Sequence, residues 1–171
     1  MALPDLATLL QTGCLISLAG LLLAAAWQDL RTLHIDNGLA IAIAALFCVW
    51  ALAGLVAEDY SWTDLVLAVG CAAALFLLGA AAFAGGLLGG GDVKLLAGVG
   101  LFAGPSLVLD LLLVTAVVGG VLGVAVLAGV PLGPVGGQGE ATLRRRLRGR
   151  MPYGPAIATG GLWVATKLVI G

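Results

Sequence analysis

The stretch "GGGDVKLLAGVGLFAGPSLVLDLLLV" (residues 89–114) contains two apolar segments with a break at Gly104-Pro105-Ser106 between them. A helix needs roughly 20 apolar residues to cross a bilayer core. The second segment continues far enough to do so, but the ten residues from Leu95 to Gly104 rise only about 15 Å as an α-helix. Whether this short segment crosses the membrane decides the topology of the whole chain.

The composition indicates a membrane protein. Of the 171 residues, 61% are hydrophobic and 10% are charged, and the mean hydropathy is +1.15. A soluble domain has about 25% charged residues, so this chain has too few to cover a water-facing surface. A lipid-exposed backbone must satisfy its own hydrogen bonds, and the apolar segments are therefore predicted to be helices. The predicted fold class is all-α, a polytopic membrane protein.

About six transmembrane helices are predicted within a single membrane-embedded domain that covers residues 1–171. The first segment lacks a basic region before it and is longer than the apolar part of a cleavable signal, so we expect it to be retained. A polar loop is expected at 131–152. The predicted spans are 6–28, 38–57, 65–88, 93–104, 107–130 and 155–171.

The distribution of arginine predicts the orientation of these helices. The only dense basic cluster, "RRRLRGR" at 144–150, should face the cytoplasm by the positive-inside rule. Arg31 follows the first span, which favours the same side for the first loop. Four crossings are then needed between the two loops, so the short segment 93–104 must cross. Both termini are expected on the non-cytoplasmic side.

Two carboxylates are predicted to lie at similar depth on the cytoplasmic side. Asp29 directly follows the first apolar segment, and Asp92 directly precedes the short fourth one. An ionisable group at the edge of a span is costly and is a functional candidate by default. Two carboxylates held close in a poorly solvated site share a proton, so that one activates water while the other polarises a carbonyl. This is the chemistry of aspartic proteases.

Glycines 89, 90 and 91 leave two interpretations open. They allow close approach of another chain, and an extended substrate strand beside Asp92 would need such clearance. Alternatively, "GGGD" is only a glycine-rich turn followed by an aspartate at the start of a helix. The residues alone favour neither interpretation.

Three segments resemble the type IV prepilin peptidases. "GGGDVKLL" (89–96) is similar to the GxGD motif of that family, and "DLRTLHIDN" (29–37) resembles its other aspartate motif. "MPYGPAIATG" (151–160) resembles the entry to the family's last helix. The order of the three segments matches that family through most of the chain.

This resemblance implies an intramembrane aspartyl endopeptidase that needs no cofactor or metal. It would remove the short basic leader of type IV (Flp-type) prepilins at the cytoplasmic boundary of the inner membrane. The expected partners are the prepilin substrate and membrane lipid, with no nucleic acid, and a homo-oligomer is left open. By resemblance the catalytic residues are Asp29 and Asp92, and the residues that shape the site or bind substrate are Gly89, Gly91, Lys94 and Arg31.

The sequence departs from that family's pattern at two points. Asp36 stands where a proline is expected, which leaves a second acid near Asp29. We retain Asp29 as the catalytic residue, because Asp36 lies beyond the polar turn where water reaches it. The long N-terminal domain with paired CxxC motifs is not seen, and the chain resembles the minimal peptidases of Flp (Tad) pili. No S-adenosylmethionine motif is visible, so we expect peptidase activity alone.

Two other classes of protein remain open. A small proton-coupled carrier could use the same acids as a relay, although carriers usually show duplicated halves. A non-enzymatic subunit of pilus or secretion assembly could use the glycines for helix packing. His34 and the three cysteines suggest no metal site, and Asp110 is expected to have a structural role.

The predicted orientation can be tested by labelling single cysteines in intact cells, in a background without the native cysteines. A cysteine at residue 140 should react only with a reagent that enters the cytoplasm, and one at residue 60 should react with an impermeant reagent. Labelling of both positions from one side would contradict the even number of crossings and would separate the two aspartates.

Overall fold

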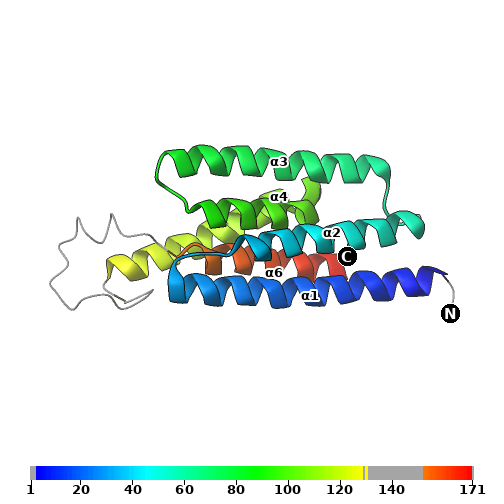
Figure 1. Cartoon of the computed structure of the whole chain (residues 1–171), viewed down its shortest axis with the longest axis horizontal. Coiled ribbons are helices and arrows are strands. Elements are labelled where there is room, and N and C mark those ends of the chain that lie inside the picture. The colour runs from blue at the N-terminus through cyan, green and yellow to red at the C-terminus, as the bar shows by residue number, and fades with distance from the viewer. Residues whose placement is uncertain (1–2, 129, 131–151, 171) are drawn as a thin grey trace.

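The computed structural model of the chain describes residues 3–128, 130 and 152–170, and these residues are almost entirely helical. No strand occurs among them, so the all-α prediction is confirmed. Four of the helices are long and apolar enough to cross a membrane, and the last is shorter. In order, the helices are α1 (Leu3–Thr32), α2 (Asn37–Val56), α3 (Trp62–Ala84), α4 (Gly90–Leu127) and α6 (Gly154–Ile170) (Figure 1).

Helix α4 consists of two helices joined at Gly104, whose backbone is not helical (φ 52°, ψ −167°). A positive φ is readily adopted by glycine, and the next residue, Pro105, suits the first position of a new helix because its missing N–H would have no partner there. The break therefore falls where the sequence has its Gly-Pro pair. The resulting parts are 90–103, called α4a below, and 105–127, called α4b.

The chain reverses direction at this break (Figure 1). In α4a, the side chain of Val99 lies beside Gly161 of α6, seven residues into that helix. In α4b, Leu111 lies beside Gly160, whereas Gly119, further along the chain, lies beside Ala156 near the start of α6. Thus α4b runs antiparallel to α6 and back along α4a. The start of α1 and the end of α6 lie toward the same end of the bundle (Figure 1).

The core lies between α1, α4 and α6, with α2 covering one side of it. Its fully buried side chains include Leu18, Leu22, Ile43 and Leu95. Glycine permits the closest crossings, because a Cβ on Gly161 would lie 2.7 Å from Leu22 and 3.1 Å from Val99. Close approach through small residues is how helices associate in lipid, where apolar burial gives little driving force.

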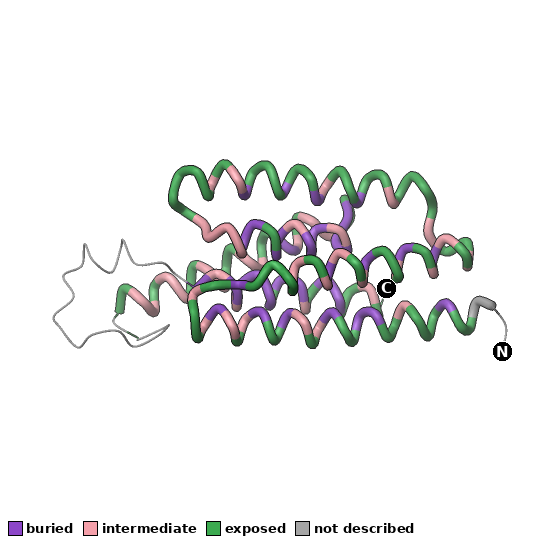
Figure 2. The backbone as a smooth tube through the Cα atoms, viewed as in Figure 1, coloured by how far each residue is buried: buried purple, intermediate pink, exposed green. Residues whose placement is uncertain are grey.

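The outward faces of the helices are apolar and exposed, most evidently along α3 (Figure 2). Leu77 and Leu78, for example, are 68% and 69% exposed. Such a surface would be a large exposed apolar patch in water, whereas in a bilayer it faces acyl chains. The arrangement agrees with the membrane class that the composition predicts.

The largest differences from the predicted boundaries are at the ends of α1 and α3. α1 continues to Thr32, beyond the predicted end at residue 28, so Asp29 lies within its last turn. α3 ends at Ala84, before the predicted end at residue 88. Gly85 follows α3 directly, and Gly86 has a φ of 73°, a conformation that terminates helices and favours glycine.

Candidate active site

Asp29 and Asp92 come together at one end of the bundle, where α1 ends and α2, α4a and α6 begin; we call this the carboxylate end. They are the only buried charged side chains among the described residues, with 4% and 6% of their surface exposed. Ile35, six residues after Asp29, packs on Gly91, the residue before Asp92, so the two carboxylates are brought to the same end of the bundle. Buried charges without a cationic partner are costly and call for a specific explanation.

The carboxylate of Asp29 is held by the start of the last helix. The backbone N–H of Gly154 donates a hydrogen bond of 2.7 Å to Asp29 Oδ2, across 125 positions of sequence. The first N–H groups of a helix have no partner within the helix and carry its positive dipole end, so they bind a carboxylate well. The segment "MPYGP" was recognised in the sequence, but this role of Gly154 was not.

Gly154 also leaves no room for a side chain beside that carboxylate. A Cβ at this position would lie 2.6 Å from Asp29 Cβ and 2.8 Å from Asp29 Oδ2. Any side chain at residue 154 would therefore move the carboxylate or the start of α6. A glycine is needed here for the close approach of two helices.

Asp92 lies in the first turn of α4 and interacts with the N-terminus of its own helix. The backbone N–H of Gly89 donates to Asp92 Oδ2 at 3.1 Å, as in the second half of a capping box. The other oxygen, Asp92 Oδ1, is buried and has no hydrogen-bond partner among the described residues. Such unsatisfied buried atoms are uncommon and often mark a reacting group.

The three glycines before Asp92 have different surroundings. A Cβ on Gly91 would lie 2.9 Å from the Cβ of Ile35 and 3.1 Å from its carbonyl oxygen, whereas one on Gly90 would meet only the ring of Phe83, at 3.6 Å. A Cβ on Gly89 would lie 2.7 Å from Asp92 Oδ2. The clearance that one of the two interpretations assigned to a substrate strand is therefore occupied at Gly91 by the chain itself.

Ile35 belongs to the segment that connects α1 to α2 and carries the first aspartate motif. Leu33, the first residue after α1, has a φ of 51° and donates its N–H to the Asp29 carbonyl oxygen at 2.8 Å. A left-handed conformation costs a non-glycine residue about 1–2 kcal/mol. Ile35, 3% exposed, then packs against the start of α4a. The two aspartate motifs are thus packed directly on each other.

Asp36 has a structural role that explains an acid where the resemblance leads one to expect proline. It is the N-cap of α2, and its side chain accepts a hydrogen bond from the N–H of Gly38. Its own N–H donates to Gln28 Oε1 at 3.0 Å. Asp36 is exposed, which distinguishes it from the two buried carboxylates.

The two basic residues proposed from the resemblance lie near this end and are exposed. Lys94 Nζ donates to Asn37 Oδ1 at 2.7 Å and so links α4a to the start of α2. The guanidinium of Arg31 lies 4.3 Å from the ring centre of Trp27, one turn earlier on α1. Lys94 thus joins two helices at the carboxylate end, while Arg31 is held on its own helix.

Of the remaining polar residues from the sequence analysis, Asp110 lies in α4b and His34 lies in the connection between α1 and α2. Trp163 Nε1 donates to Asp110 Oδ2 at 3.4 Å, which links α4b and α6 as a structural role requires. His34 is exposed. The described part of the chain contains no group of three histidine, cysteine or acidic residues that could hold a metal. The polar loop and the arginine cluster at 144–150 fall outside the described residues.

One of the comparisons with known proteins gives a match. The sequence model of the type IV leader peptidase family matches residues 16–124, a range that contains both Asp29 and Asp92. Gly154 lies beyond the matched range. Neither the comparison with curated proteins nor the comparison with solved structures gave a match.

The glycines before Asp92 can be compared by single alanine substitutions. Gly91→Ala should displace Ile35, and Gly89→Ala should displace the Asp92 carboxylate, so each should lower peptidase activity per folded molecule more than tenfold, or about 1.4 kcal/mol in barrier. Gly90→Ala adds only an ordinary contact with Phe83 and should stay within about twofold of wild type. Equal and mild effects at all three positions would mean that the glycines form only a turn.

Gly154→Ala tests whether the start of α6 positions Asp29. The added methyl group should move the carboxylate and lower kcat more than tenfold, with KM little changed because the substrate is still bound. Gly119→Ala is the matched control, since its Cβ would face the same part of α6 at an ordinary 3.6 Å. A normal kcat for Gly154→Ala would exclude this positioning role.

Proposed function

Because the chain belongs to the type IV leader peptidase family, we propose that it is an intramembrane aspartyl endopeptidase with Asp29 and Asp92 as its catalytic pair. One observation carries the proposal: the only two buried charged side chains of the described residues are carboxylates, and both lie at the same end of the bundle. Among the described residues these two acids have no cationic partner, and a catalytic role accounts for the cost of burying them.

The proposed reaction is the hydrolysis of one peptide bond. The ionised member of the pair removes a proton from a water molecule, whose oxygen attacks the carbonyl carbon, while the protonated member donates its proton to the carbonyl oxygen. The tetrahedral intermediate then collapses and the carbon–nitrogen bond breaks. The leaving nitrogen receives the proton that was taken from water. The other carboxylate takes back a proton from a hydroxyl of the intermediate as the carbonyl re-forms, so the pair returns to its shared-proton state.

The hydrogen bonds to the two carboxyl groups suit this chemistry. Asp29 and Asp92 each accept a backbone N–H at Oδ2, from Gly154 and Gly89 respectively. These bonds fix the orientation of both groups before substrate arrives, which avoids reorganisation during the reaction. The unpartnered Oδ1 of Asp92 is then the oxygen available to water or to the substrate carbonyl.

The substrate that best fits is a prepilin with a short basic leader and a following apolar helix. The carboxylates lie at one end of the bundle, not at its middle, and this depth suits a cleavage site at the membrane boundary. We propose that the protein is a multi-pass protein of the inner membrane, with the carboxylate end toward the cytoplasm. The leader would remain in the cytoplasm and the apolar helix would enter the bilayer.

Asparagine substitutions of the pair provide the direct test. Asp29→Asn and Asp92→Asn keep the size of the side chain but remove its proton exchange, so each should insert normally and leave a prepilin unprocessed in an immunoblot for the leader. Asp36→Asn is the matched control, because asparagine is as good an N-cap as aspartate, and it should process normally. Loss of processing in Asp36→Asn together with normal processing in Asp29→Asn would reverse our assignment.

A further inference from the structure

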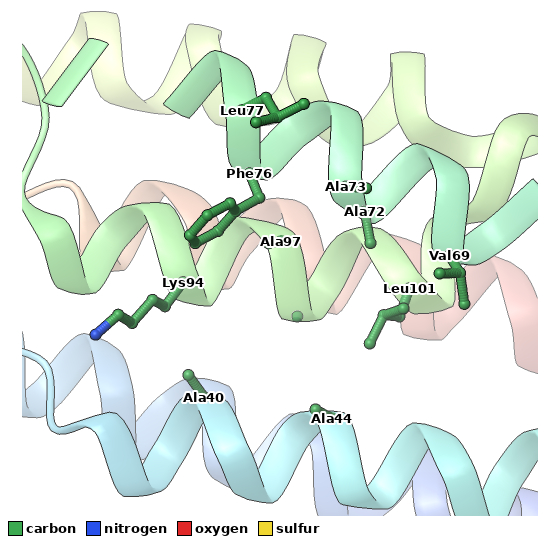
Figure 3. A pocket seen from close by; sticks show the side chains of 11 residues that line it. Ala40, Ala44, Val69, Ala72, Ala73, Phe76, Leu77, Lys94, Ala97 and Leu101 are labelled. Atoms are coloured by element: carbon green, nitrogen blue, oxygen red, sulfur yellow. The ribbon is translucent and has the colours of Figure 1, made fainter. Parts of the chain in front are cut away.

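A groove runs along the outer surface of the bundle between α2 and α3, with α4a as its floor (Figure 3). Its volume is about 480 Å³. Its walls are Ala40 and Ala44 of α2 and Val69 and Phe76 of α3, and its floor includes Ala97 and Gly98 of α4a. Lys94 is the only polar side chain among the described residues that line it.

The groove exists because α2 and α3 do not pack on each other. Among the described helices, α3 packs mainly on α4, whereas α2 packs on α1 and α4. Gly98 brings α2 close to α4a, because a Cβ there would lie 3.2 Å from Ile43, and Gly100 does the same for α3 at Leu75. The two outer helices are thus drawn onto one inner helix and leave a channel of small side chains between them.

The groove begins at the depth of the candidate active site. Lys94, at its mouth, comes only two residues after Asp92, or about 3 Å along the helix axis. From Lys94 to Leu101 the floor extends for about two helical turns, or roughly 10 Å. The groove therefore runs from the carboxylate end into the part of the bundle that crosses the membrane, and it opens sideways toward lipid.

We propose that this groove seats the apolar helix of the leader-bearing substrate, over the first two turns after the bond that is cleaved. This inference rests on the proposed function. The groove has the apolar lining and the direction that such a helix needs, and alanine and glycine allow the close approach by which helices associate in lipid. One end of the groove also lies at the same level along the bundle as the two carboxylates.

The position of the groove constrains how the substrate reaches the carboxylates. Two residues of an α-helix are separated by about 200° of rotation, so Lys94 and Asp92 lie on nearly opposite faces of α4a. The substrate chain must leave its helix at the mouth of the groove and cross the start of α4a in extended form. A crossing of about 10 Å takes about three residues.

The first experiment compares two substrates of the purified enzyme: a complete prepilin, and a peptide that contains the leader and cleavage site without the apolar helix. Ala44→Trp should fill the groove and lower the ratio of kcat/KM for the prepilin over the peptide by about tenfold or more. Ala45→Trp is the control, because Ala45 is exposed on the same helix but does not line the groove. It should leave the ratio unchanged.

A second experiment does not depend on catalysis. In Asp92→Asn without native cysteines, Ala73→Cys on the wall of the groove should cross-link to a prepilin with one cysteine in the second turn of its helix. Ala45→Cys should not. An unchanged substrate ratio in Ala44→Trp, or equal cross-linking at residues 73 and 45, would mean that the groove holds only lipid and would overturn the inference. Failure of the wild type to cleave either substrate would instead refute the proposed function.

Discussion

The hydrogen bond from Gly154 to Asp29 is the contact on which the carboxylate end depends. It joins the start of the last helix to the end of the first, and it places the positive end of a helix dipole against a buried acid. A buried carboxylate without such a donor would cost several kcal/mol. Asp29 therefore fixes how far along the bundle α6 begins. With α6 in that position, Gly161 lies close to Leu22 and Val99.

The same requirement explains why α4a is short. Asp92 must lie in the first turn of its helix for Gly89 to reach its carboxylate, so α4a can begin no earlier than the carboxylate end. Its residues 90–103 then rise about 21 Å, less than the roughly 30 Å of a bilayer core. Gly104 is buried, so the non-helical backbone at the reversal is covered by protein, as membrane proteins require.

Much of this fold could be predicted from local sequence, because helix formation and helix breaking are local. The apolar segments gave the helices, and Gly104-Pro105 gave the reversal. The two aspartate motifs could be identified because scarce charge in an apolar chain is conspicuous. The role of Gly154 could not be predicted in the same way, since one glycine among 27 has no local feature that indicates a partner 125 positions away.

Two further features depended on contacts between distant segments. The sequence left two interpretations of the glycines open, and the structure shows that Ile35 of the same chain lies against Gly91. The role of Asp36 as a helix cap depends on where α2 begins, and apolar segments leave such a boundary uncertain by several residues. In both cases the residue type indicated the possible roles, and the packing of distant segments determined which role the residue has.

The arrangement around α4a explains how one short helix can serve two surfaces. One of its faces carries Asp92 toward α1 and α6, and the opposite face carries Ala97 and Gly98 into the groove. The distance between a seated helix and the attacked bond would then be set by the width of α4a and not by a flexible loop. Gly91 and Gly98 keep α4a narrow where its neighbours pack on it. This is a second reason for glycines in α4a, besides the contact between Gly91 and Ile35.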